Sequence, residues 1–326
     1  MAARCVLGAD AGGSAVKWVV RGAGSRDDPT GEVPTNPADP EDTLGRLAQV
    51  VRARLAAEAA DAELVAVGLA CAGIVNDETG WLGRSPNLLG WQNQDLGVHL
   101  RAAFGELPRV LANDVNAAVY GEWRLGAGRG ARGAVMIALG TGVGGGVVCN
   151  GRLLTGARNS AGEIGHMVLD LDGPQCACGN HGCLEAYAGT VGLRRRAREL
   201  ADGDPGAGEG FRALVREMGD HLDAAALEKL AGAGDPTANA LFREAGRRLG
   251  QAVANCVQVL DPDVVIIGGG VALAGELILA PCRETARSLI MAVESRNVPI
   301  MPAELGPFAA SLGVAELARE RLEGAV

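Results

Sequence analysis

The densest group of metal-ligating side chains lies in GHMVLDLDGPQCACGNHGCLE, residues 165–185. One histidine and three cysteines follow one another as His166-x9-Cys176-x-Cys178-x4-Cys183. An imidazole and three thiolates form a complete tetrahedral ligand set, which suits zinc and leaves no open position for a catalytic water. A redox dithiol or unpaired surface thiols are the alternatives. We predict a structural zinc ion whose binding energy stabilises the loop.

Carboxylates flank this loop on both sides. Glu163 stands in GEIGH shortly before His166, and Glu185 follows Cys183 in GCLE. A histidine that binds metal through one ring nitrogen needs a partner for the other. Carboxylates and an imidazole N–H match a polyhydroxylated ligand, whose hydroxyl groups both donate and accept hydrogen bonds. The metal loop is therefore expected to form a rigid wall of a sugar-binding site.

Three glycine-rich turns have the composition of phosphate-binding loops. Glycines let backbone N–H groups approach phosphate oxygens, and an acid at a strand end can hold Mg²⁺ directly or through water. The candidate nucleotide contacts are Asp10, Gly12, Gly13, Ser14 and Lys17 in DAGGSAVK, Gly140, Thr141 and Gly142 in LGTGVGGG, and Gly268, Gly269 and Gly270 in IGGG. Neither the P-loop motif nor the dinucleotide-binding motif fits these turns, so both of those sites are disfavoured.

A candidate catalytic base, Asp114, lies in ANDVNAA at a predicted strand–helix junction. Phosphoryl transfer to an alcohol needs a base that orients the acceptor. An aspartate with an unperturbed pKa of about 3.9 is ionised at neutral pH and can accept the hydroxyl proton. The small residues around it would let another surface approach closely. The alternative is structural, because Asn113 or Asp114 would also serve as an ordinary helix N-cap, and the residues alone leave both roles open.

The turns follow strand-like apolar runs. Residues 5–20 and 134–154 share one layout, a β-rich run, a glycine turn with one hydroxyl and a second β-rich run, which predicts two hairpins. They suggest a duplicated fold with ligand held between the copies, although coincidence in a glycine-rich chain is the alternative. Further strands are predicted in 64–73, 109–113 and 263–272, and helices in 40–60, 114–128, 237–261 and 308–326. Strands that alternate with helices predict an α/β fold, and the last helix is expected to pack on the first lobe.

Composition narrows the class of protein. The 326 residues carry a net charge of −9, so a duplex nucleic-acid binder, which needs a basic footprint, is disfavoured. RRRAR at 194–198 is interpreted as a solvated helix face. The N-terminus lacks the pattern of a signal peptide, and the apolar runs are interrupted by Gly, Asp and Glu, which argues against membrane spans. The 8 cysteines then indicate thiols or metal ligands in a cytoplasmic enzyme.

These motifs together resemble the ROK (repressor, open reading frame, kinase) family of bacterial sugar kinases. The likeness runs over nearly the whole chain and is carried by DAGGSAVK, LANDVNAAVYGEWRLGAG, LGTGVGGGVVCNGRLLTGARNSAGEIGH, CACGNHGCLEAYAG and VVIIGGGVA. SPNLLGW at 85–91 is similar to a stretch of the glucokinase branch. The resemblance implies a two-lobed, actin-like (ribonuclease-H-like) fold with ATP and sugar in a central cleft. The small lobe would comprise residues 1–113 and 309–326, and the large lobe residues 114–308.

The resemblance also implies residue roles. Asp114 would be the base for the sugar 6-hydroxyl, and Asp10 with the glycine turns would contact Mg–ATP. The implied sugar contacts are Gly73, Asn87, Asn113, Asp114, Glu163, His166 and Glu185, and the implied zinc ligands are His166, Cys176, Cys178 and Cys183. The sequence departs from the family at Cys71 and Ala72, where many members carry proline or other small residues. Ser14 replaces the commoner threonine and keeps the hydroxyl.

The activity implied by the resemblance is that of an ATP-dependent glucokinase. The same chemistry on N-acetylmannosamine, N-acetylglucosamine, mannose, fructose or allose is an alternative, as is a sugar-sensing protein without catalysis. ATP, ADP and polyphosphate all stay open as donors. Regulators in the family carry an N-terminal helix-turn-helix, for which a chain that starts at its first strand leaves no room. A homo-oligomer, either dimer or tetramer, is expected, with no nucleic-acid or membrane partner.

Overall fold

The computed structural model describes residues 3–22 and 28–324. The chain forms two compact units: unit 1 comprises Met1–Gly130, Leu153–Ala161 and Glu304–Val326, and unit 2 comprises Ala131–Arg152 and Gly162–Ala303. These boundaries differ from the predicted ones at residues 113 and 309. The reason is the helix that begins at Asp114, which packs within unit 1 and therefore moves the boundary beyond its end.

Unit 1 is built on a five-stranded sheet with the order β3-β2-β1-β4-β8. Its strands are β1 (Ala3–Ala11), β2 (Ala15–Arg21), β3 (Thr30–Pro34), β4 (Ala62–Cys71) and β8 (Arg109–Asn113). Strands β1 and β2 form the predicted antiparallel hairpin, whereas β4 lies parallel to both β1 and β8. A smaller sheet contains β5 (Val75–Asn76), β6 (Trp81–Leu82) and β7 (Gln94–Asp95).

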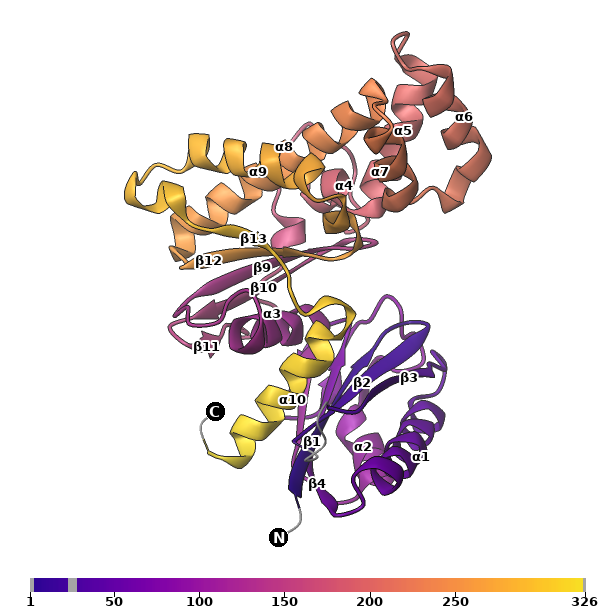
Figure 1. Cartoon of the computed structure of the whole chain (residues 1–326), viewed down its shortest axis with the longest axis vertical. Coiled ribbons are helices and arrows are strands. Elements are labelled where there is room, and N and C mark those ends of the chain that lie inside the picture. Colours follow the sequence, from indigo (N-terminus) through magenta and orange to yellow (C-terminus); the bar gives the residue numbers. More distant parts are fainter. Residues whose placement is uncertain (1–2, 23–27, 325–326) are drawn as a thin grey trace. The chain divides into compact units, whose positions relative to one another are not determined.

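Helices cover both faces of the unit 1 sheet (Figure 1). Helices α1 (Pro40–Glu58) and α2 (Leu96–Phe104) share a hydrophobic core with one face, which includes the buried Leu7. Successive strand residues point to opposite faces, so Gly8 turns to the other side. There its missing side chain makes room for α10 (Ala309–Leu322), whose backbone a Cβ on Gly8 would strike. The last helix therefore packs on the first unit, as predicted.

Helix α3 (Asp114–Leu125) also packs against α10. The two helices approach through glycines, since a Cβ on Gly121 or on Gly313 would collide with the backbone of the other helix. The carbonyl of Ala117 is the closest atom to Gly313. The small residues after Asp114 therefore serve the contact between α3 and α10.

Unit 2 repeats the topology of unit 1. Its sheet has the order β11-β10-β9-β12-β13. The strands are β9 (Ala134–Leu139), β10 (Val143–Cys149), β11 (Arg152–Leu153), β12 (Val264–Gly268) and β13 (Ile300–Pro302). As in unit 1, the first two strands are an antiparallel hairpin, and the first strand lies parallel to the fourth of the unit. The duplication expected from the two hairpins is confirmed.

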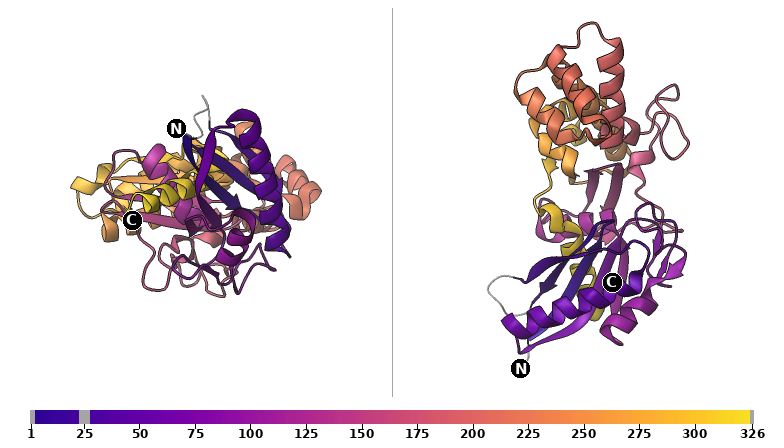
Figure 2. Two further views of the ribbon diagram at one scale, coloured as in Figure 1. Left: turned by 90° about the horizontal axis from the view of Figure 1, so that it is seen from below. Right: turned by 90° about the vertical axis from the view of Figure 1, so that its right-hand side faces the viewer.

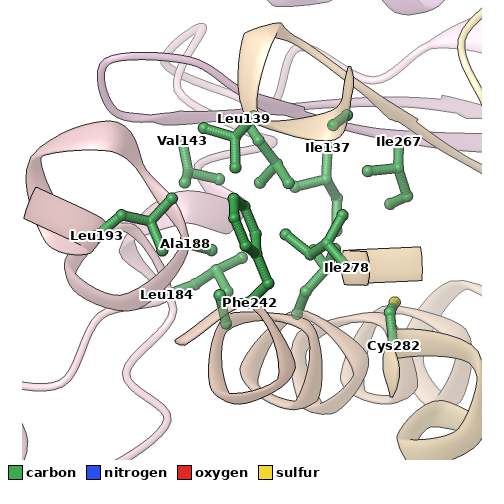
Figure 3. Packing of buried hydrophobic residues seen from close by; sticks show 14 of the residues in the cluster. Ile137, Leu139, Val143, Leu184, Ala188, Leu193, Phe242, Ile267, Ile278 and Cys282 are labelled. Carbon is green, nitrogen blue, oxygen red and sulfur yellow. The ribbon is translucent and has the colours of Figure 1, made fainter. Parts of the chain in front are cut away.

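The core of unit 2 lies between this sheet and a group of helices. They are α4 (Glu185–Ala188), α5 (Thr190–Gly203), α6 (Glu209–Met218), α7 (Ala224–Gly232), α8 (Pro236–Leu260) and α9 (Glu276–Leu289). Phe242 on α8 is fully buried and points between Leu139 of the sheet and Ile278 of α9 (Figure 3). Helices α5, α6 and α7 gather near the start of α8 (Figure 2). Short 3-10 turns complete the chain: η1 (Ile164–His166), η2 (Gly219–His221), η3 (Gly270–Ala274), η4 (Glu294–Asn297) and η5 (Gly306–Phe308).

The structure bears on two further predictions, the solvated basic run and the lack of membrane spans. In the basic run 194–198 on α5, the half-buried Arg195 and Arg198 form ion pairs with Glu199 and Asp220, whereas Ala197 is buried in the core, so only part of the run is a solvated face. Within residues 3–22 and 28–324, the structure contains no helix with both the length and the apolar character needed to cross a bilayer.

Candidate active site

One group of predicted site residues lies where the parallel strands of unit 1 end. Ala11, Cys71 and Asn113 are the last residues of β1, β4 and β8, and they are paired across the sheet. Ligands of open α/β sheets bind at such carboxyl ends. The register therefore brings Asp10 and Asp114 to one edge of the sheet.

Asp10 and Asp114 influence each other at this edge. Burial, followed by the nearby charge of Asp114, raises the pKa of Asp10 to about 7, while Lys17 acts in the opposite direction. Lys17 is paired with Asp10 across the hairpin. A carboxyl group in such surroundings gains from a bound cation, because the cation favours its ionised form. Asp10 thus fits the predicted role as a Mg²⁺ contact.

Asp114 was expected to act either as a catalytic base or as a helix N-cap, and the structure gives the N-cap position to its neighbour Asn113. Asn113 is the N-cap of α3, and its side-chain Oδ1 accepts hydrogen bonds from the N–H groups of Val115 and Asn116 at 2.9 and 3.0 Å. Asp114 is the first residue of the helix, and its Oδ1 accepts from Val115 at 3.0 Å. Because Asn113 performs the capping, the carboxylate of Asp114 is not needed to start the helix.

The side chain of Asn113 makes three hydrogen bonds within the protein. Besides its two capping bonds, its Nδ2 donates to the carbonyl of Gly73 at 3.1 Å. Gly73 has a φ of 124°, and a Cβ there would lie 2.5 Å from the carbonyl oxygen of Arg84. The loop after β4 therefore requires glycine at this position. A primary amide has two N–H groups, and among the described residues only Gly73 accepts from the Asn113 amide, which leaves one N–H for a ligand.

The first glycine turn joins β1 to β2 and is held by hydrogen bonds. The N–H of Gly12 donates to Ala15 at 3.1 Å. Thr35, just after β3, donates its hydroxyl to the carbonyl of Gly12 at 2.8 Å and its N–H to the carbonyl of Ser14 at 3.0 Å. A Cβ on Gly13 would lie 3.2 Å from the Cβ of Asn87, so the exposed Asn87 lies beside the turn.

The other two glycine turns lie together at the corresponding edge of unit 2. Strands β9 and β12 are parallel, with Ala138 paired to Gly268, so the turns 140–142 and 268–270 follow neighbouring strand ends. Gly269 has a φ of 87°, and a Cβ there would collide with the backbone of Leu139. Glycine at 269 thus permits both the left-handed backbone and the close approach of the two turns.

The four predicted metal ligands converge in unit 2. One ligand atom from each of His166, Cys176, Cys178 and Cys183 lies within 4.8 Å of every other. The Sγ of Cys176 is 3.7 Å from Nδ1 of His166, and the Sγ atoms of Cys178 and Cys183 are also 3.7 Å apart. Two thiolates on a tetrahedral zinc with bonds of about 2.3 Å would lie about 3.8 Å apart. The residues fit a zinc ion bound through Nδ1 and three sulfurs.

Glu185 connects the metal cluster to the second glycine turn. Its Oε1 is 3.4 Å from the Sγ of Cys176, and its Oε2 accepts from the N–H of Val143 at 3.0 Å. A side chain at Gly142 would occupy the position of this carboxylate. Glu163 is exposed and lies immediately before η1, which carries His166. The structure therefore brings Glu185, rather than both glutamates, into contact with the cluster and the turn.

Two threonines at these turns were missed by the sequence reasoning. Thr35 binds the first turn, and Thr190, at the start of α5, donates both its N–H and its hydroxyl to the carbonyl of Gly140 at 2.9 and 3.0 Å. Thr35 and Thr190 are 23 and 50 residues away from the glycines that they bind, so no local sequence motif links them to the turns. A threonine that follows a strand or begins a helix is common in any sequence.

Comparison with known proteins decides the family. A model described as the ROK family matches residues 6–321. The chain belongs to the ROK family. This ROK protein is 34% identical over 315 residues to a glucokinase of Streptomyces coelicolor, covering 96% of this chain and 97% of the relative. It is 36% identical over 288 residues to a glucokinase of Thermotoga maritima, covering 87% of each.

A solved ROK structure is also similar over the full length. It is a ROK family glucokinase from Streptomyces griseus in complex with glucose and AMPPNP, with a TM-score of 0.76 and 33% identity. The match covers 97% of this chain and 99% of that chain. The resemblance of this ROK protein to the family, first seen in its glycine turns and cysteine loop, is confirmed.

Proposed function

We propose that this ROK protein is an ATP-dependent glucokinase that phosphorylates the 6-hydroxyl of D-glucose, with Asp114 as the base. The observation that carries the proposal is the position of Asp114: it lies at the carboxyl edge of the unit 1 sheet, beside Asp10, while Asn113 caps the helix. The glucokinases among its relatives support the choice of glucose.

The residues of unit 1 would act on the acceptor and on the metal nucleotide. Asp114 orients the hydroxyl group and accepts its proton as the transition state forms. Asp10 holds Mg²⁺, directly or through water, beside Lys17. The ion, when bound with ATP, neutralises charge on the phosphoryl oxygens. Asn87 and the remaining N–H of Asn113 bind sugar hydroxyls, with Gly73 shaping the loop between them.

The residues of unit 2 would bind nucleotide and the rest of the sugar. The glycine turns at 140–142 and 268–270 present backbone N–H groups to phosphate and nucleotide. His166, Cys176, Cys178 and Cys183 hold a structural zinc ion, which fixes the loop. Glu163, His166 and Glu185 then accept and donate hydrogen bonds to glucose hydroxyls. With all four zinc positions filled by protein, the ion takes no direct part in the chemistry.

A coupled assay of ADP release tests this function. Glucose, mannose, fructose and the two N-acetyl hexosamines are compared, with ATP, ADP and polyphosphate as donors. We expect glucose with ATP to give the highest kcat/KM. A higher kcat/KM for another hexose would transfer the proposal to that sugar, and tight sugar binding without turnover would favour a sensor. Light scattering of the same sample tests the expected dimer or tetramer.

A further inference from the structure

In both units, the first carbonyl of the glycine turn accepts a hydrogen bond from a threonine hydroxyl. Thr35 donates its hydroxyl to Gly12 at 2.8 Å, and Thr190 donates its hydroxyl to Gly140 at 3.0 Å. Each threonine also uses its backbone N–H on the same turn: Thr35 on Ser14 at 3.0 Å and Thr190 on Gly140 at 2.9 Å. Thr35 follows a strand and Thr190 begins a helix, yet both make the same contact with a glycine turn.

The geometry of the peptide bond gives this contact a consequence. A trans peptide is planar, so its C=O and the N–H of the next residue point in opposite directions. Fixing the carbonyl of Gly12 therefore fixes the direction of the N–H of Gly13. In the same way, the bond from Thr190 to Gly140 directs the N–H of Thr141. The carbonyl of Thr141 accepts from Val191 at 3.3 Å, which directs the N–H of Gly142.

Glycine turns need such an anchor. Glycine occupies more of backbone space than any other residue, so a peptide plane between glycines reorients at little cost. A donor that must be ordered during binding lowers affinity, whereas one already held in the bound orientation does not. The threonines would remove this freedom before the nucleotide arrives.

The second turn is held from the segment that follows the metal cluster. Cys183 is the last predicted zinc ligand, Glu185 binds Val143, and Thr190 binds Gly140. The turn is thus bonded at both of its ends to residues 185–190. The first turn has no metal loop in its surroundings within the described residues, and Thr35 holds it from the end of β3.

We propose that Thr35 and Thr190 are positioning residues that aim the N–H groups of Gly13 and Thr141 at nucleotide phosphates. This inference rests on the proposed kinase function, because it assumes that the turns bind Mg–ATP. Neither hydroxyl is assigned a direct contact with substrate. Each acts through the carbonyl that it binds.

The test uses the full-length protein with Thr35→Val and Thr190→Val, which keep the side-chain shape and remove the hydroxyl. Thr35→Ser and Thr190→Ser restore it. Thr285→Val is the matched control, since Thr285 packs against Gly250 on α8. Calorimetry measures the Kd of magnesium AMPPNP and, separately, of glucose. Zinc content and melting temperature are recorded for every variant.

Each valine variant is expected to raise the Kd of magnesium AMPPNP about two- to tenfold, the effect of one neutral hydrogen bond. The effects should multiply in the double variant, because the two sites belong to separate units. The Kd of glucose and the zinc content should stay at the wild-type values, and the serine variants and Thr285→Val should bind nucleotide normally.

Wild-type nucleotide affinity in both valine variants would overturn the inference, as would serine variants that are impaired as much as the valine ones. An equal loss of glucose and nucleotide affinity would also overturn it, because that indicates a general structural role. Wild-type protein that binds glucose but no magnesium nucleotide would overturn the proposed function together with this inference. Normal wild-type binding with unchanged variants would overturn the inference alone.

Discussion

At the scale of single residues, Asn113 and Asp114 are neighbours with different tasks because the helix begins between them. Asn113 accepts the first free N–H groups of α3, and Asp114 follows as the first helical residue. A helix needs only one capping side chain for these donors. Because Asn113 has the capping role, the proposal that Asp114 accepts a proton does not compete with the start of the helix.

Replacing Asp114 by asparagine tests that division. Asp114→Asn should lower kcat by about 10²- to 10⁴-fold, the usual contribution of general base catalysis. The melting temperature and the affinities for glucose and magnesium AMPPNP should change little, since the cap is intact. Asp95→Asn is the control, because Asp95 caps α2 in the same unit. Retained turnover in Asp114→Asn would remove Asp114 from the base role.

Asp10 gives a prediction about pH. Its pKa is about 7 in the folded protein, mainly through burial, whereas an aspartate in the unfolded chain has a pKa of about 3.9. The native state therefore holds a proton that the unfolded state has released, and stability falls as pH rises between these values. Asparagine does not ionise, so Asp10→Asn avoids this fall in the free energy of unfolding. The variant should stabilise the metal-free protein by up to about 4 kcal/mol at pH 8.

Urea unfolding of the metal-free protein at several pH values measures this difference. The advantage of Asp10→Asn over wild type should grow from pH 4 to pH 7 and then level off. Asp202→Asn, an exposed change on α5, should show no such growth. If the free energy of unfolding depended on pH in the same way for wild type and Asp10→Asn, burial would not raise the pKa of Asp10 as inferred.

At the scale of elements, the proposed metal loop lies next to the second glycine turn, with Glu185 in contact with both. The four proposed zinc ligands enclose residues 166–183, and Glu185, the first residue of α4, accepts a hydrogen bond from Val143 at the start of β10. The loop is thus expected to support both the sugar contacts and the glycine turn. Removal of the metal should disturb binding without unfolding the sheet of unit 2, because none of the four ligands belongs to its hydrophobic core and only Met167 and Leu169 of the loop pack against that core.

Cys178→Ser tests the loop. Loss of one thiolate should lower the affinity for zinc by more than about 100-fold, because even the loss of a residue that only hydrogen-bonds to a metal ligand costs up to about that much. We expect a lower melting temperature and a higher Kd for glucose through the freed His166 and Glu185. Cys149→Ser is the control, because Cys149 is exposed and outside the cluster. Unchanged glucose affinity in zinc-free protein would contradict the role of the loop as a wall of the sugar site.

At the scale of the whole molecule, the chain first leaves unit 1 after residue 130, returns to it over residues 153–161, and enters it for the last time at residue 304. Glu122, fully buried near the end of α3, bonds the chain near the first and the last of these places. Its Oε1 accepts from the N–H groups of Glu304 and Leu305 at 2.9 and 2.8 Å, and its Oε2 accepts from Ala127 at 3.0 Å. One carboxylate thus anchors the first and the last of these connections on the unit 1 side.

Glu122→Ala should lower the free energy of unfolding by about 3 kcal/mol or more, because three backbone N–H groups lose a charged acceptor. Urea denaturation measures this change, and limited proteolysis should detect new cleavage near residues 127 and 304. Glu217→Ala, an exposed change on α6, should stay within about 0.5 kcal/mol of wild type. Equal stability and protease resistance in Glu122→Ala would contradict the anchoring role.

The sequence alone determined the features that depend on local chemistry. Hairpins, helix starts and the cluster of His166 with three cysteines follow from glycine turns, capping residues and cysteine spacing, and all of these lie within short stretches of chain. The fold class followed from the alternation of strands and helices together with the motifs of the ROK family. Asp10, Asp114 and the glycine turns were identified because their residue types suit phosphoryl transfer.

Only the tertiary structure decided what depends on contacts between distant segments. The boundary of unit 1 lies beyond α3 because Gly121 meets Gly313, and the sequence gives no sign of that pairing. Thr35 and Thr190 reach their turns across many residues, and Glu122 meets Glu304 in the same way. Such partners are chosen by packing and by the need to satisfy buried polar groups, neither of which leaves a local pattern.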